Sequence, residues 1–283
     1  VLHVANREGL TQVVEGDIRD DQGLRSAMRH VDVVFHLAAQ AQVLAADRDP
    51  DYCFSTNVAG TINVLAAART AGVGRVVFTS SREVYGEPSH LPVDEGQPLK
   101  PKNDYGASKV AAEAYCRTMG DSDGLSTVTL RLSNVYGPGD ADRLVPRWLA
   151  RADADADLEI FGGRQVLDMA WVGMVIHALV AASRPEVATT TVNVGAGRGT
   201  SIGDIAARIL AATGSTSRVV VRPARRIEVE RFVADVRRMR DTLGVAPPDD
   251  PLHGIDAMIR AGRITAAGKQ EAIGRLVPIH SAG

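Results

Sequence analysis

Short runs of apolar and β-branched residues alternate with helix-forming segments along most of this 283-residue chain. Runs such as residues 31–37 are too short for helices and read as buried strands. Strands that alternate with helices of roughly 10 to 15 residues predict βαβ units, and therefore a parallel sheet. Right-handed crossovers put helices on both faces of such a sheet and ligands at the carboxyl ends of its strands. The predicted fold class is therefore α/β, a Rossmann-type doubly wound parallel sheet.

Local signals set the bounds of the predicted elements. Asp20 or Asp21 is suited to cap a helix N-terminus, and Gly72 to end a helix. The predicted strands cover residues 12–17, 31–37, 75–79, 126–132, 158–161, 191–194 and 218–222. The predicted helices cover residues 20–29, 55–71, 104–119, 143–153, 173–182 and 201–213, with two more near the C-terminal end. Residues 86–103 are expected to form a loop and residues 134–138 a turn.

Composition excludes several classes of function. The net charge of −2 and the lack of a long basic run argue against a nucleic-acid partner. No apolar run approaches the ~18 residues of a membrane helix, so we expect no membrane partner. Two distant cysteines suggest no disulfide framework and favour a cytoplasmic location. No His or Cys stands at metal-ligand spacing from another ligand, so no metal site is predicted.

The most informative pair of polar residues is Tyr105 and Lys109, which open the helix predicted at 104–119. Residues four apart lie on one helix face, so the phenol and the ammonium become neighbours. A nearby cation lowers the pKa of a phenol, and a tyrosine with a lowered pKa can act as a general base. A surface pair on a helix is the common alternative, because this spacing often arises by chance.

Two further features fall where the predicted sheet would place a ligand. Ala38 and Ala39 follow a buried strand and are small enough for a cofactor to approach the backbone. Thr79, Ser80 and Ser81 follow the next strand along the chain. Helix–sheet packing would explain the alanines and turn formation would explain the serines. The three features in this order favour a cofactor site at the carboxyl ends of the strands.

Seven runs of the sequence match the pattern of one family. They are EGDIR at 15–19, HLAA at 36–39, NVAGT at 57–61, VFTSSREVYG at 77–86, YGASK at 105–109, LRLSNVYGP at 130–138 and NVG at 193–195. With these runs the chain resembles the extended short-chain dehydrogenase/reductase family, in the branch of nucleotide-sugar epimerases, dehydratases and decarboxylases. The resemblance extends from about residue 12 to 245 and implies NAD as cofactor and a nucleoside-diphosphate sugar as substrate.

The resemblance also implies roles for individual residues. Tyr105 would remove a proton from a sugar hydroxyl, Lys109 would hold the nicotinamide ribose and lower the pKa of Tyr105, and Ser81 would bond the reacting oxygen. Asp17 would bind the adenine amino group. The remaining residues assigned to the cofactor are Ile18, Leu37, Ala38, Ala39, Asn57 and Thr79. Those assigned to the substrate, besides Ser81, are Asn134, Leu144, Phe161, Gln165 and Arg225.

The beginning of the chain departs from the family pattern. Such folds open with a strand and a glycine-rich turn that holds the pyrophosphate, and neither occurs here. We expect that the initial strand and turn are missing from this sequence. The alternative is a truncated protein, which would bind NAD poorly.

A second departure lies at Leu167, where the family commonly has an arginine that contacts the diphosphate. Loss of a charge-assisted contact costs ~1.5–3 kcal/mol if it is buried. Either Arg164 or Arg147 compensates, or the nucleotide is held differently.

The third departure, Arg82 before Glu83, bears on the reaction. The 4,6-dehydratases of the family carry an Asp-Glu pair here, and a guanidinium cannot replace the acid. The leading hypothesis is an NAD-dependent nucleotide-sugar epimerase that oxidises the sugar transiently at C4. A dehydratase or decarboxylase that uses Glu83 as a second acid or base is the alternative, and Glu83 could equally form only an ion pair with Arg82. A non-catalytic NAD-binding regulatory protein is a third possibility.

The resemblance implies two domains and a dimer. An NAD-binding domain is expected over residues 1–135, with 170–195 returning to it, and a substrate-binding lobe over 136–169 and 196–283. A homodimer is expected through the helices at 55–71 and 104–119.

Overall fold

The computed structural model describes residues 2–5, 11–122, 125–140, 143–225, 227 and 229–262. The expected N-terminal domain boundary at residue 1 and the end of the expected lobe at residues 263–283 lie outside these described parts. Among the described helices, none is long and apolar enough to cross a membrane.

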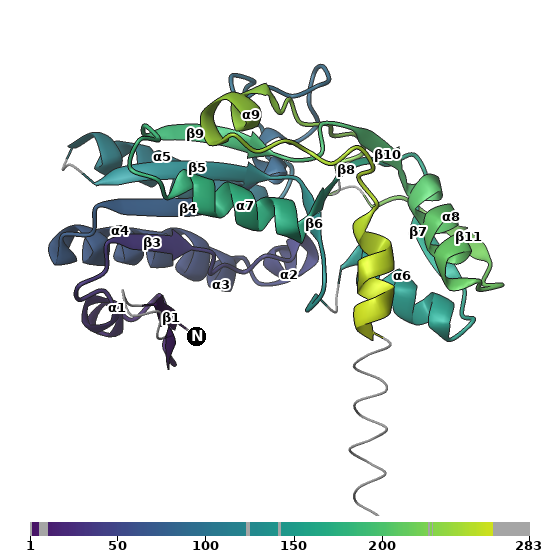
Figure 1. Cartoon of the computed structure of the whole chain (residues 1–283), viewed down its shortest axis with the longest axis horizontal. Helices are drawn as coiled ribbons and strands as arrows, with labels where there is room; N and C mark the ends of the chain where they lie inside the picture. The colour runs from purple at the N-terminus through teal and green to yellow at the C-terminus, as the bar shows by residue number, and fades with distance from the viewer. Residues whose placement is uncertain are drawn as a thin grey trace, which may run out of the picture.

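A four-stranded parallel sheet forms the centre of the molecule. Its order is β3 (Val33–His36), β4 (Arg75–Ser81), β5 (Ser126–Leu132) and β9 (Thr190–Val194). In Figure 1 these strands run side by side, with α7 (Val172–Ala182) in front of them. The α/β class and the parallel sheet predicted from the sequence are confirmed.

The alternation of side chains along β4 explains why helices cover both faces of this sheet. Val76 and Phe78 are buried in a cluster with α4 (Gly60–Ala71) and α5 (Asp104–Ser122), whereas Val77 is buried in another cluster with α7. Successive strand residues point to opposite faces, so a continuously apolar strand needs cover on both. The helix α1 (Asp21–Ala27) belongs to the first layer and α9 (Arg237–Leu243) to the second.

The strand predicted at residues 12–17 is shorter in the structure and does not belong to the four-stranded sheet. The structure has β2 (Thr11–Val14) paired antiparallel with β1 (Leu2–Ala5), in a separate two-stranded ribbon. Within the described sheet, β3 pairs with β4 alone. Phe35, in this edge strand, and Leu37, just after it, are 43% and 53% exposed, although their sequence pattern is that of a buried strand.

The helix predicted at 55–71 begins earlier than expected. Asp49 accepts a hydrogen bond from the backbone N–H of Tyr52 (3.0 Å), and Pro50 occupies the first helical turn, where its missing N–H costs nothing. The helix α3 (Pro50–Phe54) then passes through one π-helical segment (Ser55–Ala59) into α4. A short helix, α2 (Val43–Arg48), precedes it. Gly72 ends α4 with φ of 71°, as predicted.

The rest of the chain builds a lobe at one end of the sheet (Figure 1). The lobe contains two small sheets, one with the strand order β10-β8-β6 and one with β11 next to β7, whose bounds are given below. Residues 134–138, predicted as a turn, instead begin with a strand, and β8 and β10 were not predicted. The bounds are β6 (Asn134–Tyr136), β7 (Leu158–Phe161), β8 (Val166–Trp171), β10 (Gly199–Ser201), β11 (Val219–Arg222), α6 (Leu144–Asp153), α8 (Ile202–Thr213) and a helix at 254–262.

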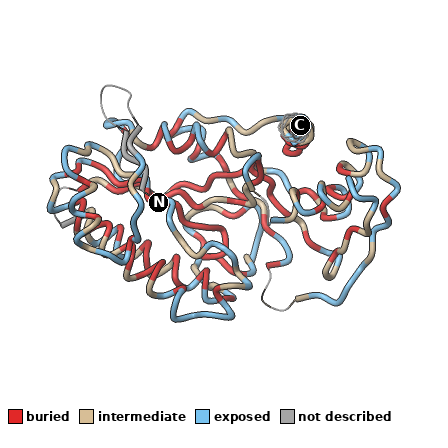
Figure 2. Tube along the Cα trace, turned by 90° about the horizontal axis from the view of Figure 1, so that it is seen from below, coloured by how far each residue is buried: buried red, intermediate tan, exposed pale blue. Residues whose placement is uncertain are grey.

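The lobe has an apolar cluster of its own. Trp148, Leu158, Ile205 and Ile255 are among its buried members, and they come from α6, β7, α8 and the helix at 254–262. Figure 2 shows buried segments in both parts of the molecule. The lobe therefore has an apolar cluster that is distinct from those of the main sheet.

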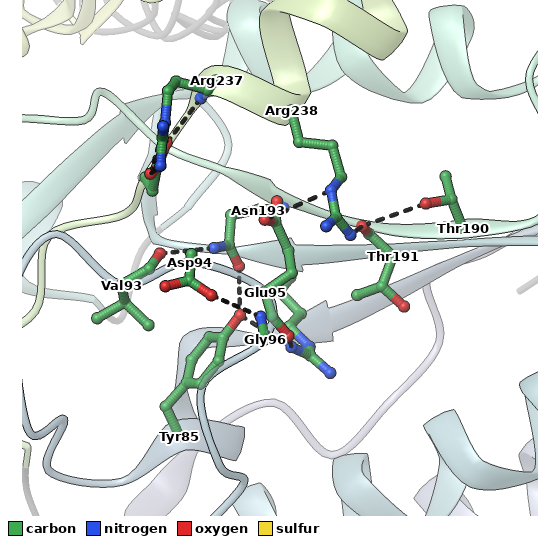
Figure 3. A network of polar contacts seen from close by, with 12 residues as sticks. Tyr85, Val93, Asp94, Glu95, Gly96, Thr190, Thr191, Asn193, Arg237 and Arg238 are labelled. Atoms are coloured by element: carbon green, nitrogen blue, oxygen red, sulfur yellow. Dashed lines mark hydrogen bonds and ion pairs between the residues drawn. The ribbon is translucent and has the colours of Figure 1, made fainter.

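A polar network holds the loop after β4 against the sheet (Figure 3). The Tyr85 hydroxyl donates to Oδ1 of Asn193 (2.7 Å), and Nδ2 of Asn193 donates to the carbonyl of Val93 (2.8 Å). The Glu95 carboxylate accepts from the backbone N–H of Asn193 (2.8 Å) and pairs with Arg238. These bonds fix the end of the turn that contains Glu83.

Candidate active site

Residues from three neighbouring parts of the fold line one cavity of about 260 Å³. Ser81 comes from the end of β4, Glu83 from the 3₁₀ turn η2 (Arg82–Tyr85), and Tyr105 from the first turn of α5. The lobe closes the other side with Asn134, Leu144 and further residues. The cavity is lined by Ala41, Gln42, Val43, Ser81, Arg82, Glu83, Tyr105, Ser133, Asn134, Val135, Tyr136, Arg143, Leu144, Val145, Leu167 and Met169.

A close approach of two backbones brings α5 to this turn. A Cβ atom at Gly106 would lie 2.6 Å from the carbonyl oxygen of Glu83, so only glycine fits there. Asn103 joins the two segments, because its Oδ1 accepts from the Gly106 N–H (2.8 Å) and its Nδ2 donates to Oε2 of Glu83 (2.9 Å). The glycine in the YGASK run is thus what allows Tyr105 to lie beside Ser81.

Tyr105 is 9% exposed and forms a hydrogen bond with Ser81. Burial raises the pKa of Tyr105, and the charge of Glu83 acts in the same direction. The bond with Ser81 and the charge of Arg143 act to lower that pKa, but they do not outweigh burial. The net shift of the Tyr105 pKa is upward, and the largest influences on it are burial, Ser81 and Arg143. The lowering effect expected of Lys109 stays a prediction.

Lys109 lies behind the tyrosine and does not line the cavity. Its Nζ is 5.9 Å from the Tyr105 ring centroid and donates to the carbonyl of Thr79 (2.8 Å). Burial lowers the pKa of Lys109 to about 8, so the ammonium is still protonated at neutral pH. An ammonium has three N–H donors, and the bond to Thr79 uses one of them.

Both carboxylate oxygens of Glu83 are engaged within the protein. Oε1 pairs with Nη2 of Arg82 (2.9 Å), and Oε2 accepts from Asn103. The side chains of Arg82 and Glu83 are 11% and 8% exposed. The ion pair considered from the sequence is therefore present, in a buried position on the cavity wall.

The residues assigned to the cofactor fall into three groups. Leu37 and Ala38 are exposed and Ala39 is half-buried at the carboxyl end of β3. Thr79 is buried, and its hydroxyl donates to the His36 carbonyl (3.1 Å). The third group, Asp17 and Ile18, follows β2, where Asp17 is exposed and Ile18 is buried.

Asp17 is bonded to a neighbour in the chain. Arg19 Nη2 lies 2.6 Å from Oδ2 of Asp17, and hydrogen bonds from Arg19 lower the pKa of Asp17 to about 2. Ile18 packs against Gly60, where a Cβ atom would lie 2.6 Å from its Cδ1. The Asp17 carboxylate therefore faces solvent, whereas the Ile18 side chain is buried.

The side-chain amide of Asn57 forms its hydrogen bonds within the protein. Its Oδ1 accepts from the Gln40 N–H (2.7 Å), and its Nδ2 donates to the Gln40 carbonyl (3.1 Å) and to Oγ of Ser108 (2.9 Å). The side chain is buried, so it positions the loop after Ala39 against α5.

The residues assigned to the substrate separate into two places. Asn134 and Leu144 line the cavity together with Ser81. Phe161, Gln165 and Arg225 do not line it. They contact one another instead, with the Arg225 guanidinium 3.7 Å from the Phe161 ring centroid and Gln165 donating to the Phe161 carbonyl.

The sequence argument missed Arg143. It lines the cavity next to Leu144 and acts on the pKa of Tyr105. Leu167, where the family commonly has arginine, lines the same cavity, whereas Arg164 and Arg147 are exposed and do not line it. No spacing marks Arg143, because the segment before α6 reaches the cavity only through the tertiary fold.

The carboxyl ends of β3 and β4 fit a dinucleotide such as NAD. The exposed apolar surface of Leu37 and Ala38 is suited to the flat rings and the ribose edges of such a molecule. Lys109 holds further N–H donors, and Asp17 holds an exposed carboxylate for an amino group. These are the donor and acceptor types that the binding of a dinucleotide at the carboxyl edge of a parallel sheet requires.

A Rossmann-type sheet with a serine–tyrosine pair at its carboxyl edge defines the class of dinucleotide-dependent α/β enzymes. The chain belongs to the NAD dependent epimerase/dehydratase family, whose model matches residues 2–195.

Relatives and solved structures agree with this assignment. The putative UDP-glucose 4-epimerase of Methanocaldococcus jannaschii is 33% identical over 88% of this chain and 83% of its own. The dTDP-glucose 4,6-dehydratase of Streptomyces griseus is 31% identical over 86% of this chain and 75% of its own. A Thermotoga maritima UDP-glucose 4-epimerase solved with UDP-glucose superposes with a TM-score of 0.86 at 27% identity, covering 92% of this chain and 88% of that one.

Proposed function

We propose that this protein is an NAD-dependent epimerase that inverts C4 of a nucleoside-diphosphate sugar. The observation that carries the proposal is the hydrogen-bonded pair of Ser81 and Tyr105 on the wall of a cavity that has a dinucleotide-binding edge behind it. The 4-epimerase names of relatives at 33% identity support the reaction.

The side chains divide the proton chemistry among them. Tyr105 takes the proton of the sugar hydroxyl, and Ser81 donates a hydrogen bond to the same oxygen. NAD held at the carboxyl ends of β3 and β4 would supply the acceptor for a hydride from the sugar carbon and, once reduced, the donor that returns this hydride to the other face of the ketone. Because burial raises the pKa of Tyr105, the phenolate needs stabilisation during the reaction, and the Ser81 bond and the Arg143 charge provide it. Asn134 and Leu144 hold the substrate on the lobe side.

The two parts of the chain take different ligands in this proposal. Residues 1–135 and 170–195 bind NAD, and 136–169 and 196–283 bind the sugar nucleotide; the separate apolar cluster of the lobe supports this division. Phe161, Gln165 and Arg225 form an outer group that suits the nucleotide base, since a planar guanidinium already stacks there on an aromatic ring.

A homodimer through 55–71 and 104–119 is part of the proposal. Tyr115 on α5 is 43% exposed, a large side chain of the kind that interfaces cover. A cytoplasmic location is supported by Cys53 and Cys116, which are both free and buried.

Dehydration or decarboxylation is the second candidate, because Glu83 lines the cavity and a dehydratase is among the relatives. Arg82 and Asn103 hold both oxygens of Glu83, however, so the carboxylate is not free to exchange a proton. This geometry favours epimerisation.

The test is turnover of UDP-glucose by the full chain with NAD, followed by chromatography of the products. Tyr105→Phe is expected to abolish turnover, whereas Glu83→Gln should reduce it less than about tenfold. Glu186→Gln, on a 68% exposed side chain, is the matched control. A loss near a thousandfold in Glu83→Gln, or a dehydrated product, would support elimination instead. Bound NAD without turnover of any nucleotide sugar would favour a regulatory protein.

A further inference from the structure

We propose that Asp168 is a positioning residue, whose buried carboxylate ties the lobe wall of the cavity to the main sheet and so fixes where a ligand lies relative to Ser81 and Tyr105. The inference rests on the proposed function, since a nucleotide sugar is the ligand whose position matters for the reaction. Asp168 lies within β8, is fully buried and does not itself line the cavity. It therefore acts through its neighbours.

Three backbone N–H groups from two segments converge on the Asp168 carboxylate. Oδ1 accepts from the N–H of Ala196 (2.6 Å), and Oδ2 accepts from those of Gly197 (3.0 Å) and Ala234 (2.9 Å). Ala196 and Gly197 follow directly after β9, the strand at one end of the main sheet. Ala234 belongs to the segment at residues 231–236. One side chain thus joins the lobe strand β8 to two segments outside it.

A carboxylate is the side chain that suits this junction. Burial raises the pKa of Asp168 to about 6, although the three hydrogen bonds and the charge of Arg82 act to lower it. At neutral pH the group is therefore ionised, and its two oxygens can accept all three bonds. An asparagine would keep one acceptor oxygen and would turn its own N–H donors toward backbone N–H groups.

Close packing leaves the carboxylate little freedom to move. A Cβ atom at Gly195 would lie 2.8 Å from Oδ1 of Asp168 and closer still to Oγ of Ser133. The N–H of Ser133 donates to the carbonyl of Val194, the last residue of β9 (2.9 Å). The end of β9 therefore lies directly against both Asp168 and Ser133, and Ser133 lines the cavity.

The alternation of side chains along β8 carries this anchorage to the cavity. Successive residues of a strand point to opposite faces. Leu167 and Met169, on either side of Asp168, both line the cavity. Met169 also pairs with Asn134 of β6, which lines the cavity too. A shift of β8 at Asp168 would therefore move wall residues on two strands of the lobe.

The segment that contains Ala234 also contacts the turn that follows Ser81. The ring of Phe232 stacks with that of Tyr85 in η2, with 5.9 Å between the ring centroids. A bridge between Ala234 and Val93 ties the segment to the loop after η2. The carboxylate is therefore bonded to a segment that packs against the reacting side of the cavity.

A buried aspartate that only supports the fold is the alternative. Loss of such a residue lowers the fraction of folded protein but leaves kcat per folded molecule unchanged. Loss of a positioning residue instead lowers kcat in molecules that still bind NAD, because a misplacement of about 1 Å can cost on the order of a hundredfold in rate. KM should change little, since the cavity keeps the groups that bind the substrate.

The experiment is turnover of UDP-glucose by the full chain carrying Asp168→Asn, expressed per molecule of bound NAD. We expect kcat to fall roughly ten- to a hundredfold and KM to change less than about threefold. Asp155→Asn is the matched control and should leave both constants unchanged. Asp155 is an exposed carboxylate of the lobe that also accepts a backbone N–H, from Thr216 (3.1 Å).

Two further measurements cover the case in which Asp168→Asn does not fold. Trp148 and Trp171, the two tryptophans of the chain, lie in the lobe, so their emission reports whether the lobe is folded. Hydrogen exchange of the wild type needs no variant. Binding of UDP-glucose to the NAD complex steadies the wall, and it should slow exchange of the three amides bonded to Asp168 by at least about threefold. Asp168→Asn should lose this slowing.

The outcomes separate the inference from the proposed function. An absence of slowing in the wild type, or a measurable kcat per bound NAD that is equal in wild type and Asp168→Asn, would overturn the inference. Either result with turnover of UDP-glucose by the wild type would leave the proposed function standing. Slowed exchange that depends on Asp168, in a protein that turns over no nucleotide sugar, would support the inference and overturn the proposed reaction.

Discussion

The buried ion pair of Arg131 and Glu113 is expected to be a main support of the site. Nη2 of Arg131 lies 2.7 Å from Oε2 of Glu113, and Nε lies 3.0 Å from Oε1. Ser80 also donates to Oε1 (2.5 Å), so the pair fixes the strand end that carries Ser81. The side chains of Arg131 and Glu113 are 6% and 4% exposed. Burial alone would lower the pKa of Arg131, but Glu113 outweighs it and the net pKa is raised.

Glu113→Gln should therefore destabilise the fold by about 3–5 kcal/mol, because it leaves the Arg131 guanidinium buried without a counter-charge. The exposed pair of Arg222 and Glu159 has a similar separation (2.9 Å), with side chains 52% and 33% exposed. Arg222→Gln should cost less than about 1 kcal/mol. The two variants thus compare the same interaction in two environments.

The assay is urea unfolding followed by far-UV circular dichroism. The double variant Glu113→Leu with Arg131→Met should cost less than the sum of the two single variants, since no unpaired charge is left. If Glu113→Gln costs no more than Arg222→Gln, the pair contributes nothing beyond a surface bridge, and our account of the strand end is refuted.

Two further predictions concern Lys109 and the turn at Gly86. Burial lowers the pKa of Lys109 to about 8 from 10.5, so between these values the unfolded chain binds a proton that the folded chain does not, and stability rises with pH. Lys109→Met should therefore stabilise the fold by up to about 3 kcal/mol below pH 8, and this gain in stability should fade by pH 10.5. Urea titrations at several pH values measure it, and a gain that does not change with pH would contradict the burial of a charge. Gly86 has φ of 64°, and a Cβ atom there would lie 1.9 Å from the Lys100 carbonyl oxygen. Gly86→Ala should lower the free energy of unfolding by more than ~2 kcal/mol, whereas Gly72→Ala, with φ of 71° and open space around it, should lower it by only about 1 kcal/mol. Equal losses for the two variants would show that backbone strain alone, and not the clash, determines the cost.

Local chemistry explains the elements that were predicted well. Asp20 caps α1 by accepting from the Gln22 N–H (3.1 Å), and Gly72 ends α4, because both signals act within one helical turn. The strand β4 was found because it is buried on both faces, which leaves a continuous apolar run at residues 76–78. The strand β5 was found from its β-branched and alternating apolar residues. The missed strands β8 and β10 belong to a small sheet of the lobe. The strand β10 has three residues and takes its place only by pairing with β8.

The electrostatics of the site could not be read from spacing. Tyr105 and Lys109 do share a helix face, but the Lys109 ammonium is drawn to the Thr79 carbonyl, and burial decides the pKa of the tyrosine. Both effects depend on which segments surround α5. Arg143 lines the cavity for the same reason, although no sequence motif linked its segment to the site.

The sequence by itself determined the parallel α/β class and the order of its strands and helices, because hydrophobic periodicity and caps are local. It also determined which side chains end β4 and begin α5. The tertiary structure alone decided that Asn57 bonds Gln40 and Ser108, that Phe161, Gln165 and Arg225 do not line the cavity, and that Arg82 is buried in an ion pair with Glu83. These properties depend on distances between segments far apart in the chain and on the exclusion of water between them, which no pattern of neighbouring residues encodes.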